Sequence, residues 1–392
     1  MYETRTSRQM LQSRTSRPHF RDADRIAILS RKAPRLMSTE RKTSILEPAR
    51  VRIANEAAAS QPASILDHSS VPVLGLAVLL LAGGCTPGAS TRESENRPAA
   101  SVTVTRTEDG YLFAEGPDSV LLYRDHPLHP DHAYARAHYI HPLFSLDGEI
   151  LTEDSPEDHP HQHGLYWAWH QMFVDGTRIG DGWTQENISW DVRDVDVVQE
   201  TTSPAIRTRV HWISPNLTDD RGEPIPFVEE TAEFRVHPRQ AEYREIDVSV
   251  ELLALVDGVR IGGSEDEKGY GGFSARIRLP DDIRFVGPAG TVVPRNEHVD
   301  AGAWIDMSAS LGGPRPSGLA ILQHPSNPGY PQPWILRREQ SMQNAKWPGA
   351  APISLDPDQP VTLRYRLVVH EGRADSIDLV DLHARYAATQ DE

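Results

Sequence analysis

The sequence predicts an all-β protein, a large antiparallel β-sandwich of the supersandwich type that ends in one short helix. The first observation is composition, because 31 Pro and 27 Gly in 392 residues are typical of many short strands joined by turns. The second is that several segments alternate apolar and polar residues with a period of two, as strands with one buried face do. The length of the chain allows one large β domain.

The domain is predicted over residues 101–388, and three strands are expected at its start. Residues 101–107, 111–115 and 119–124 are separated by an Asp109-Gly110 turn and a Gly116-Pro117 break. Further strands are expected at residues 190–198, 206–213, 230–237, 243–255, 272–279, 319–324 and 361–370. The last of these places one set of apolar side chains on a single face: Val361, Leu363, Tyr365, Leu367 and Val369.

The C-terminal segment has a different pattern. Ile377, Val380, Ala384 and Ala387 follow Ser376 at helical spacing. A short helix capped by Ser376 is therefore predicted over residues 376–388.

The single cysteine, Cys85, ends the apolar stretch of residues 71–85, directly after small residues. The stretch is shorter than the roughly 20 apolar residues of a membrane span and matches a bacterial lipoprotein signal. We therefore predict export, a lipid anchor on Cys85 in a bacterial membrane, and a domain that faces the periplasm or the cell exterior. Residues 86–100 are then a flexible tether, and residues 1–70 a mis-assigned or disordered extension. The alternatives for residues 71–85 are a short membrane anchor or a buried strand.

Charge excludes one class of partner. Residues 1–84 hold 13 Lys/Arg and 7 Asp/Glu, whereas residues 85–392 hold 27 and 49, a net charge of −22. Such an acidic domain repels phosphate backbones, so no nucleic-acid partner is expected.

With one cysteine, no disulfide can form within the chain.

Histidines mark the candidate site. Nine of the fifteen histidines after Cys85 fall between His126 and His170. Proline at positions 156 and 160 prevents a regular helix, so His159, His161 and His163 are expected on an extended loop that enters a strand. On an extended chain these three imidazoles project to one side, and the two tryptophans that follow, Trp167 and Trp169, are expected to line a pocket.

Three interpretations of this cluster compete. His159, His161 and His163 with a carboxylate could bind Zn, Cu or Fe. Alternatively, histidine supplies general acid–base catalysis and hydrogen bonds to a polyhydroxylated ligand, with Trp faces stacked on it. In the third, the imidazoles only satisfy turn backbones and cap strands. The second is our prediction, with no cofactor, and a transition metal on these three histidines is kept as an alternative.

Two further segments resemble the edges of a pocket. Residues 265–273 place three acids and Lys268 before glycines, which allow a backbone to approach a ligand closely. Residues 324–334 form a proline-stiffened loop that presents Asn327, Trp334 and Arg337. An acidic hairpin and a purely structural loop are the alternatives. His161, His163 and Lys268 are the predicted catalytic residues; the predicted substrate-binding residues are His141, Trp167, Trp169, Asn327, Trp334 and Arg337.

Several motifs together resemble a known bacterial family. They are Tyr139-Ile-His-Pro-Leu, His159-Pro-His-Gln-His-Gly-Leu-Tyr-Trp-Ala-Trp, Gly180-Asp-Gly-Trp183 and Lys268-Gly-Tyr-Gly-Gly-Phe. The family is one often labelled "methane oxygenase PmoA", and the likeness covers most of residues 101–388. Methane oxidation is not implied, because a membrane subunit of such an enzyme needs several apolar spans and nothing after Cys85 approaches one. The element order is also similar to galactose-mutarotase-type supersandwich proteins, in which a His-Gly pair enters a strand.

These observations lead to three hypotheses of function. The first is a carbohydrate-active epimerase, lyase or hydrolase that acts on a sugar or another small polar substrate. The second is a non-catalytic module that binds a glycan or a partner. The third, nearest to the family label, is a metal-dependent oxidoreductase. No phosphate-binding loop, dinucleotide fingerprint, His-Glu-x-x-His or Gly-x-Ser-x-Gly motif is present.

Overall fold

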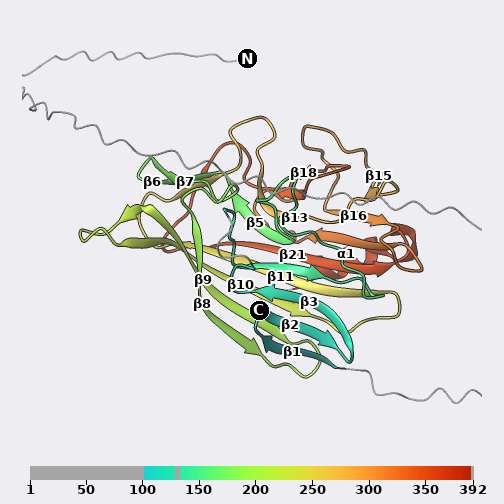
Figure 1. Ribbon diagram of the computed structural model, residues 1–392. Helices are drawn as coiled ribbons and strands as arrows, with labels where there is room; N and C mark the ends of the chain where they lie inside the picture. Colours follow the sequence, from blue (N-terminus) through green and yellow to red (C-terminus); the bar gives the residue numbers. More distant parts are fainter. Residues whose placement is uncertain (1–100, 129–132, 390–392) are drawn as a thin grey trace, which may run out of the picture. The chain divides into compact units, whose positions relative to one another are not determined.

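The computed structural model describes residues 101–128 and 133–389, the coloured part of Figure 1. Cys85 and the predicted signal, tether and N-terminal extension lie outside these residues. None of the helices in the described part has the length and apolar character that crossing a membrane requires.

The first of three antiparallel sheets has eight strands in the order β1-β2-β3-β4-β5-β13-β19-β18. They are β1 (Val102–Thr107), β2 (Gly110–Glu115), β3 (Asp118–Arg124), β4 (Tyr139–Leu143), β5 (Leu165–Trp169), β13 (Gly271–Ala275), β19 (Gln343–Lys346) and β18 (Trp334–Ile335). The three strands expected at the start of the domain are therefore β1, β2 and β3.

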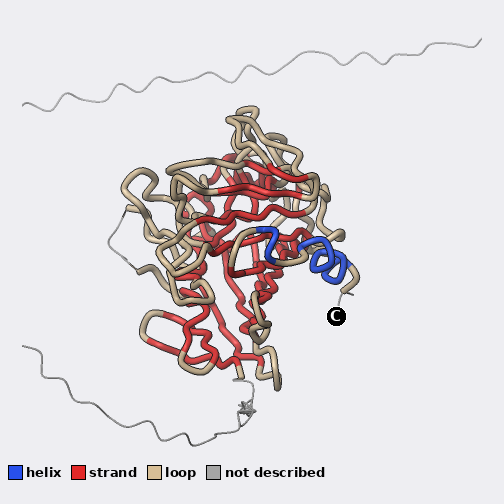
Figure 2. Tube along the Cα trace, turned by 90° about the vertical axis from the view of Figure 1, so that its right-hand side faces the viewer, coloured by secondary structure: helices blue, strands red, loops and turns tan. Residues whose placement is uncertain are grey.

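The second sheet has nine strands in the order β15-β14-β16-β17-β21-β11-β10-β9-β8. They are β15 (Gly290–Thr291), β14 (Arg284–Gly287), β16 (Trp304–Ala309), β17 (Ser317–Gln323), β21 (Val361–Glu371), β11 (Tyr243–Ala254), β10 (Pro224–Val236), β9 (Ala205–Thr218) and β8 (Ser189–Val198). A four-stranded sheet comprises β20 (Ile353–Ser354), β12 (Arg260–Gly262), β6 (Gln171–Val174) and β7 (Thr177–Gly180). Strands dominate the described part in Figure 2, so the predicted fold class, a large antiparallel β-sandwich, is confirmed.

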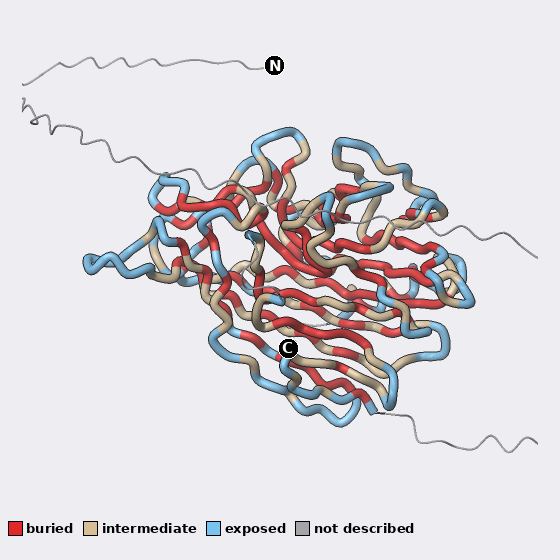
Figure 3. The backbone as a smooth tube through the Cα atoms, in the orientation of Figure 1, coloured by how far each residue is buried: buried red, intermediate tan, exposed pale blue. Residues whose placement is uncertain are grey.

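The core lies between the eight-stranded and nine-stranded sheets, and long stretches of their strands consist of buried residues, drawn red in Figure 3. Aromatic rings meet across this interface: Trp169 of β5 lies 5.4 Å from Trp212 of β9, and Phe273 of β13 stacks at 4.6 Å on Tyr365 of β21, both measured between ring centroids. Such pairs contribute roughly 0.5–1.5 kcal/mol each beyond the area that they bury. The apolar face predicted for residues 361–370 packs in this core.

One carboxylate is buried in the core. Glu230 of β10 is fully buried, and its Oε1 accepts hydrogen bonds from Trp167 Nε1 and His138 Nε2, each at 2.6 Å. Its Oε2 accepts from Trp212 Nε1 at 2.7 Å. A buried carboxylate is tolerated when hydrogen-bond donors surround it. Glu230 therefore ties both sheets together through polar contacts.

The C-terminal helix is present but begins later than predicted. A 3₁₀ turn, η1 (Ala374–Ser376), precedes α1 (Leu379–Ala387). The cap of α1 is Asp378, whose side chain accepts a hydrogen bond from the Asp381 backbone N–H, so Ser376 is not the cap of this helix. The buried face is also different, since Leu379, Leu382 and Tyr386 pack on the nine-stranded sheet while Val380 is 64% exposed.

Candidate functional site

The face of the eight-stranded sheet that points away from the core carries four of the clustered histidines. Along β5, Trp167 points into the core, whereas Tyr166 and Ala168 pack in a separate outer cluster with Trp183 and Tyr270. Two histidine–aspartate pairs lie along this outer side. We call it the histidine face and define it by His141, His161, His163, His170, Asp154 and Asp181.

A buried arginine holds the loop that presents these histidines. Arg276 follows β13, and its guanidinium donates to Glu153 Oε2 at 2.8 Å, Gln162 Oε1 at 2.9 Å and both oxygens of Asp158 at 3.0 Å. Charge-assisted bonds of this kind are the strongest hydrogen bonds in proteins. The loop of residues 153–162 is thus fixed to the sheet although it has no regular secondary structure.

The glycine after His163 permits a close approach of two strands. A Cβ atom on Gly164 would lie 2.1 Å from the Ile140 carbonyl oxygen, so any side chain at this position would clash with the backbone. Glycine is therefore required at this position. The close approach places the His163 ring 5.0 Å from the Tyr139 ring, measured between centroids.

The first pair of the histidine face is Asp154 and His163, both largely shielded from solvent. His163 Nδ1 lies 2.7 Å from Asp154 Oδ1, and the Tyr139 hydroxyl donates to Asp154 Oδ2 at 3.0 Å. Burial raises the pKa of Asp154, but the hydrogen bond and charge of His163 outweigh burial and leave this pKa below its usual 3.8. The carboxylate is therefore ionised and orients the imidazole with its Nδ1–H toward Asp154.

Gln185 links this pair to its neighbours. Its Nε2 lies 2.9 Å from His163 Nε2 and 3.4 Å from the His161 carbonyl oxygen. In the neutral form of His163, with Nδ1–H directed at Asp154, Nε2 carries a lone pair that accepts from the Gln185 amide. The second imidazole nitrogen of His163 thus faces a hydrogen-bond donor on the outer side of the sheet.

Two other imidazoles on this face are neutral at physiological pH. Burial lowers the pKa of His141 from its usual 6.5 to about 4, and His141 Nδ1 lies 3.0 Å from Thr152 Oγ1. Burial also lowers the pKa of His161 to about 4, and repulsion from His159, His170 and His163 adds to the effect. Both can accept a proton without first losing one.

These two depressed pKa values predict a stability change with pH. In the unfolded chain both histidines take up protons near pH 6.5, whereas in the folded protein they do so only near pH 4. Their contribution to stability is present above pH 6.5 and is lost as the pH falls toward 4. Urea unfolding between pH 4 and 7 gives the slope of the unfolding free energy against pH. In the His141→Asn/His161→Asn double variant this slope should be smaller, and the decrease should correspond to up to about two fewer protons taken up on unfolding. Identical slopes in the two proteins would contradict this prediction.

The second pair is His170, which follows β5, and Asp181, which follows β7. His170 Nδ1 lies 2.9 Å from Asp181 Oδ2, and the His170 ring stacks on Trp183 at 5.3 Å between centroids. Asp181 Oδ1 accepts from the backbone N–H groups of Trp183 and Thr184 at 2.9 and 3.0 Å. Burial raises the pKa of Asp181, but the hydrogen bonds from His170 and from the backbone outweigh burial. The pKa of Asp181 is therefore below 3.8. This carboxylate is also ionised and committed to an imidazole.

The acidic segment before β13 brings an aromatic ring and a cation to the same face. The Tyr270 ring lies 5.6 Å from that of Trp183 between centroids, and Lys268 Nζ lies 5.7 Å from the centroid of Tyr270. Arg337 donates through Nη2 to the Tyr270 hydroxyl at 2.6 Å and to the Asn296 carbonyl at 2.8 Å. Its Nη1 donates to the Arg295 and Leu336 carbonyls at 2.6 and 2.9 Å. Arg337 therefore supports Tyr270, whereas Lys268 is part-exposed and lies 4.0 Å from Asp266 Oδ2.

The predicted tryptophans do not line this face. Trp167, Trp169 and Trp334 are each no more than 1% exposed, and their Nε1 groups donate to Glu230, to the Trp347 carbonyl and to the Gly302 carbonyl. The physical reason is that the regular strand begins at Leu165, after Gly164, so alternation from that point turns Trp167 and Trp169 inward. On the outer side of the sheet Trp183 is itself buried, and Tyr270 is the half-buried aromatic ring that packs against it.

Asn327 is also structural. Its Nδ2 donates to the Arg364 carbonyl at 2.8 Å, and its Oδ1 accepts from the Arg364 N–H at 2.6 Å. This paired bond fixes the loop of residues 324–333 to β21. Asn327 is buried and holds the loop, so the predicted contact with substrate is corrected.

Two of the three histidines proposed as an alternative metal site are paired with different carboxylates. His159 Nδ1 lies 2.8 Å from Asp158 Oδ2, whereas His163 Nδ1 binds Asp154. In the ranges that the structure describes, no group of three or more His, Cys, Asp or Glu side chains is placed to hold a metal ion.

Several residues of the site were not selected from the sequence, among them Asp181, Trp183, Tyr270 and Arg276. Asp181 and Trp183 belong to the Gly180-Asp-Gly-Trp183 motif, and Tyr270 lies in the segment that drew attention to Lys268, so each had a local signal. Arg276 had none, because the acids that it binds are more than 110 positions away.

Fold and site together define an antiparallel β-sandwich protein with a histidine–aspartate face on one sheet. The chain belongs to the family of unknown function DUF6807, whose model matches residues 114–384. The likeness to the family labelled methane oxygenase PmoA stays a prediction.

Other comparisons add little. No curated protein matches the chain. One similar solved structure is the crystal structure of a heparan sulfate lyase HepC mutant from Pedobacter heparinus, with a TM-score of 0.33 and 8% identity over 70% of this chain and 36% of that chain. The match thus spans about a third of the lyase, and a TM-score this low carries no argument about function.

Proposed function

We propose that the histidine face binds a sugar or sugar derivative and that His163 transfers a proton during its conversion. The single observation that supports this most is the Asp154–His163 pair. Asp154 holds one nitrogen of the imidazole at 2.7 Å, and the other nitrogen faces the outer side of the sheet next to Gln185. A carboxylate that fixes the tautomer and orientation of an imidazole is the arrangement that general acid–base catalysis needs.

Within this proposal, proton abstraction is favoured over glycoside hydrolysis. Hydrolysis usually requires two carboxyl groups on either side of the scissile bond. Asp154 and Asp181 are each bound to a histidine, so neither is available for that role. An epimerase or lyase instead needs one base beside an acidic C–H group, and His163 meets that requirement when a substrate displaces the Gln185 amide from Nε2.

The neighbours of His163 suit a polyhydroxylated ligand with a carbonyl or carboxylate group. Tyr270 offers part of an aromatic face, and Trp183 lies beneath it. Lys268, half-exposed at the edge, offers a positive charge. Ligand sites commonly combine an apolar surface with a few polar groups that fix orientation.

The proposal is tested by incubating the purified protein with uronic-acid oligosaccharides and keto-sugars and by measuring binding calorimetrically. We expect one of these sugars to bind and to be converted. Lys268→Ala should weaken its binding by roughly tenfold, which corresponds to about 1.4 kcal/mol. Asn327→Ala is the control and should leave affinity unchanged, because Asn327 only braces a loop. No binding and no conversion of any of these sugars would refute the proposal.

A non-catalytic binding module is the second candidate. It would use Tyr270 and Lys268 as described but would need no proton transfer. Unchanged affinity in His163→Gln together with no detectable conversion of a bound sugar would favour this second function.

A further inference from the structure

The nine-stranded sheet carries a cavity on its own outer side. The cavity measures about 560 Å³ and is lined by side chains of β10, β11, β21 and α1, among them Arg235, His237, Asp247, Arg366 and Tyr386. Cavities of this size hold small organic ligands. Its walls are mainly charged or hydroxylated, so it suits a polar ligand.

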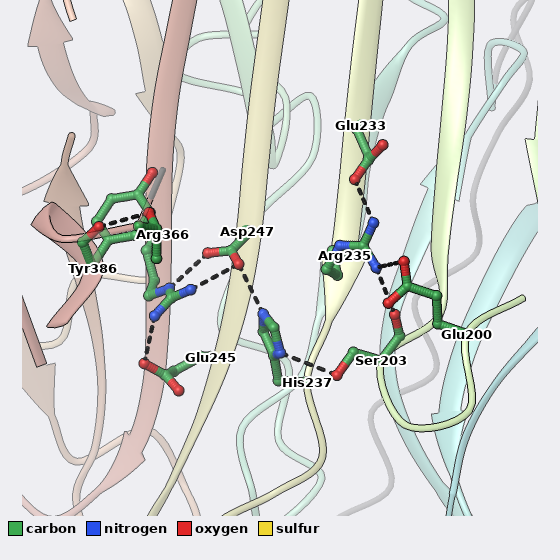
Figure 4. Close-up of polar contacts among 10 residues, drawn as sticks. Glu200, Ser203, Glu233, Arg235, His237, Glu245, Asp247, Arg366 and Tyr386 are labelled. Atoms are coloured by element: carbon green, nitrogen blue, oxygen red, sulfur yellow. Dashed lines mark hydrogen bonds and ion pairs between the residues drawn. The ribbon is translucent and has the colours of Figure 1, made fainter. Parts of the chain in front are cut away.

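A chain of hydrogen bonds ends at this cavity (Figure 4). The Ser203 hydroxyl lies 3.1 Å from His237 Nδ1, and His237 Nε2 lies 2.8 Å from Asp247 Oδ2. Ser203 comes from the segment between β8 and β9, His237 directly follows β10, and Asp247 belongs to β11. A serine, an imidazole and a carboxylate in this order are the elements of a nucleophilic triad, which is recognised by geometry and not by sequence position.

Asp247 is held in place from its other side. Arg366 donates through Nε to Asp247 Oδ1 at 2.6 Å and through Nη2 to Oδ2 at 2.8 Å. Its guanidinium lies 4.7 Å from the ring centroid of Tyr386 and also binds Glu245 at 3.0 Å. Bidentate pairing of this kind fixes a carboxylate in one orientation.

These contacts determine which nitrogen of His237 can act as a base. Burial raises the pKa of Asp247, but the hydrogen bonds from His237 and Arg366 outweigh burial and lower it below 3.8, so the carboxylate is ionised. The carboxylate accepts the Nε2–H of His237. The lone pair of Nδ1 is therefore directed at the Ser203 hydroxyl, as activation of a serine nucleophile requires.

We propose that Ser203, His237 and Asp247 form a second catalytic centre that hydrolyses short-chain acyl esters of polar alcohols. Ser203 Oγ attacks the carbonyl carbon while its proton moves to His237 Nδ1, and the alcohol leaves with that proton. Water then attacks the acyl-enzyme, gives a proton to His237 and releases the carboxylic acid, which regenerates Ser203. Ester and water become acid and alcohol, so the reaction needs no other reactant.

The backbone at Ser203 is held by a neighbouring arginine. Arg235 Nη1 donates to the Ser203 carbonyl oxygen at 3.1 Å, and the same guanidinium pairs with Glu200 at 2.6 Å and with Glu233 at 2.8 Å. Arg235 therefore positions the nucleophile, while its charge is balanced by these two carboxylates. His237 and Asp247 line the cavity and Ser203 adjoins it through its contact with His237, so the polar lining favours a small acyl group, such as acetyl, over a lipid chain.

A fluorophosphonate probe tests the proposal, because it labels only activated serines. The full chain should take up one phosphonyl group, located on Ser203 by peptide mass spectrometry, and should hydrolyse p-nitrophenyl acetate. Ser203→Ala should abolish labelling, and His237→Gln should slow it by at least about 100-fold. The preceding residue, Thr202, is exposed and also carries a hydroxyl, so Thr202→Ala is the matched control and should label as the unchanged chain does.

Two results would overturn the proposal. One is the absence of labelling in the unchanged chain; the other is label on a residue other than Ser203, which would leave Ser203 as a structural donor only. If Ser203→Ala does not fold, as judged by circular dichroism, the proposal is tested by the other two measurements: the residue that carries the label in the unchanged chain and the rate at which His237→Gln is labelled. His163→Gln should label normally, so failure of this centre is distinguishable from failure of the histidine face.

Discussion

Replacing His163 by glutamine is expected to lower the conversion of a uronic-acid or keto-sugar substrate by at least about 100-fold. Glutamine can keep a hydrogen bond to Asp154, but it cannot accept a proton. Affinity should therefore change by only a few fold, while kcat falls. Steady-state kinetics that separate kcat from KM provide the measurement.

A histidine on the other sheet supplies the control. His211 of β9 also pairs with a carboxylate, since its Nε2 lies 3.2 Å from Glu229 Oε2. His211→Gln should leave kcat and KM unchanged. If His163→Gln retained more than half of the original kcat, His163 would not be the acid–base group.

Replacing Glu230 by leucine is expected to cost about 3–5 kcal/mol of stability. Three buried N–H groups, those of His138, Trp167 and Trp212, would lose their acceptor at once. Each unsatisfied donor costs roughly 1–3 kcal/mol, against a typical total stability of about 5–15 kcal/mol. Urea unfolding followed by tryptophan fluorescence measures the loss directly.

The adjacent residue makes a matched control for this change. Glu229 is part-exposed and its carboxylate pairs with His211 at the surface of β10. Glu229→Leu should change stability by no more than about 1 kcal/mol, as surface ion pairs contribute little. A Glu230→Leu protein within about 1 kcal/mol of the original would show that the buried network is not needed for stability.

The long strands could be predicted from sequence because one of their faces is buried and the other is not. β11 alternates in this way along its length, and its buried apolar side chains lie in the core as expected. β16 was not predicted, since all six of its residues are buried and no alternation remains to be detected. The two-residue strands β15, β18 and β20 are too short for any periodic signal.

The candidate site was predictable only in part. His141, His161, His163 and Lys268 lie on the histidine face or at its edge, and the clustering of histidines in the sequence pointed to them. The direction of the tryptophans depended on where β5 begins, which a one-residue shift reverses. The contact between His163 and Gln185 joins residues 22 positions apart through a turn, and spacing alone gives no sign of it.

The most direct test of the account is a crystal structure of the protein soaked with a uronic-acid disaccharide. We expect the sugar on the histidine face, with one of its atoms within about 3.5 Å of His163 Nε2, a near-attack distance. Its ring should contact Tyr270, and its carboxylate should lie near Lys268. A sugar bound at saturating concentration elsewhere on the protein, with the histidine face empty, would contradict the proposed site.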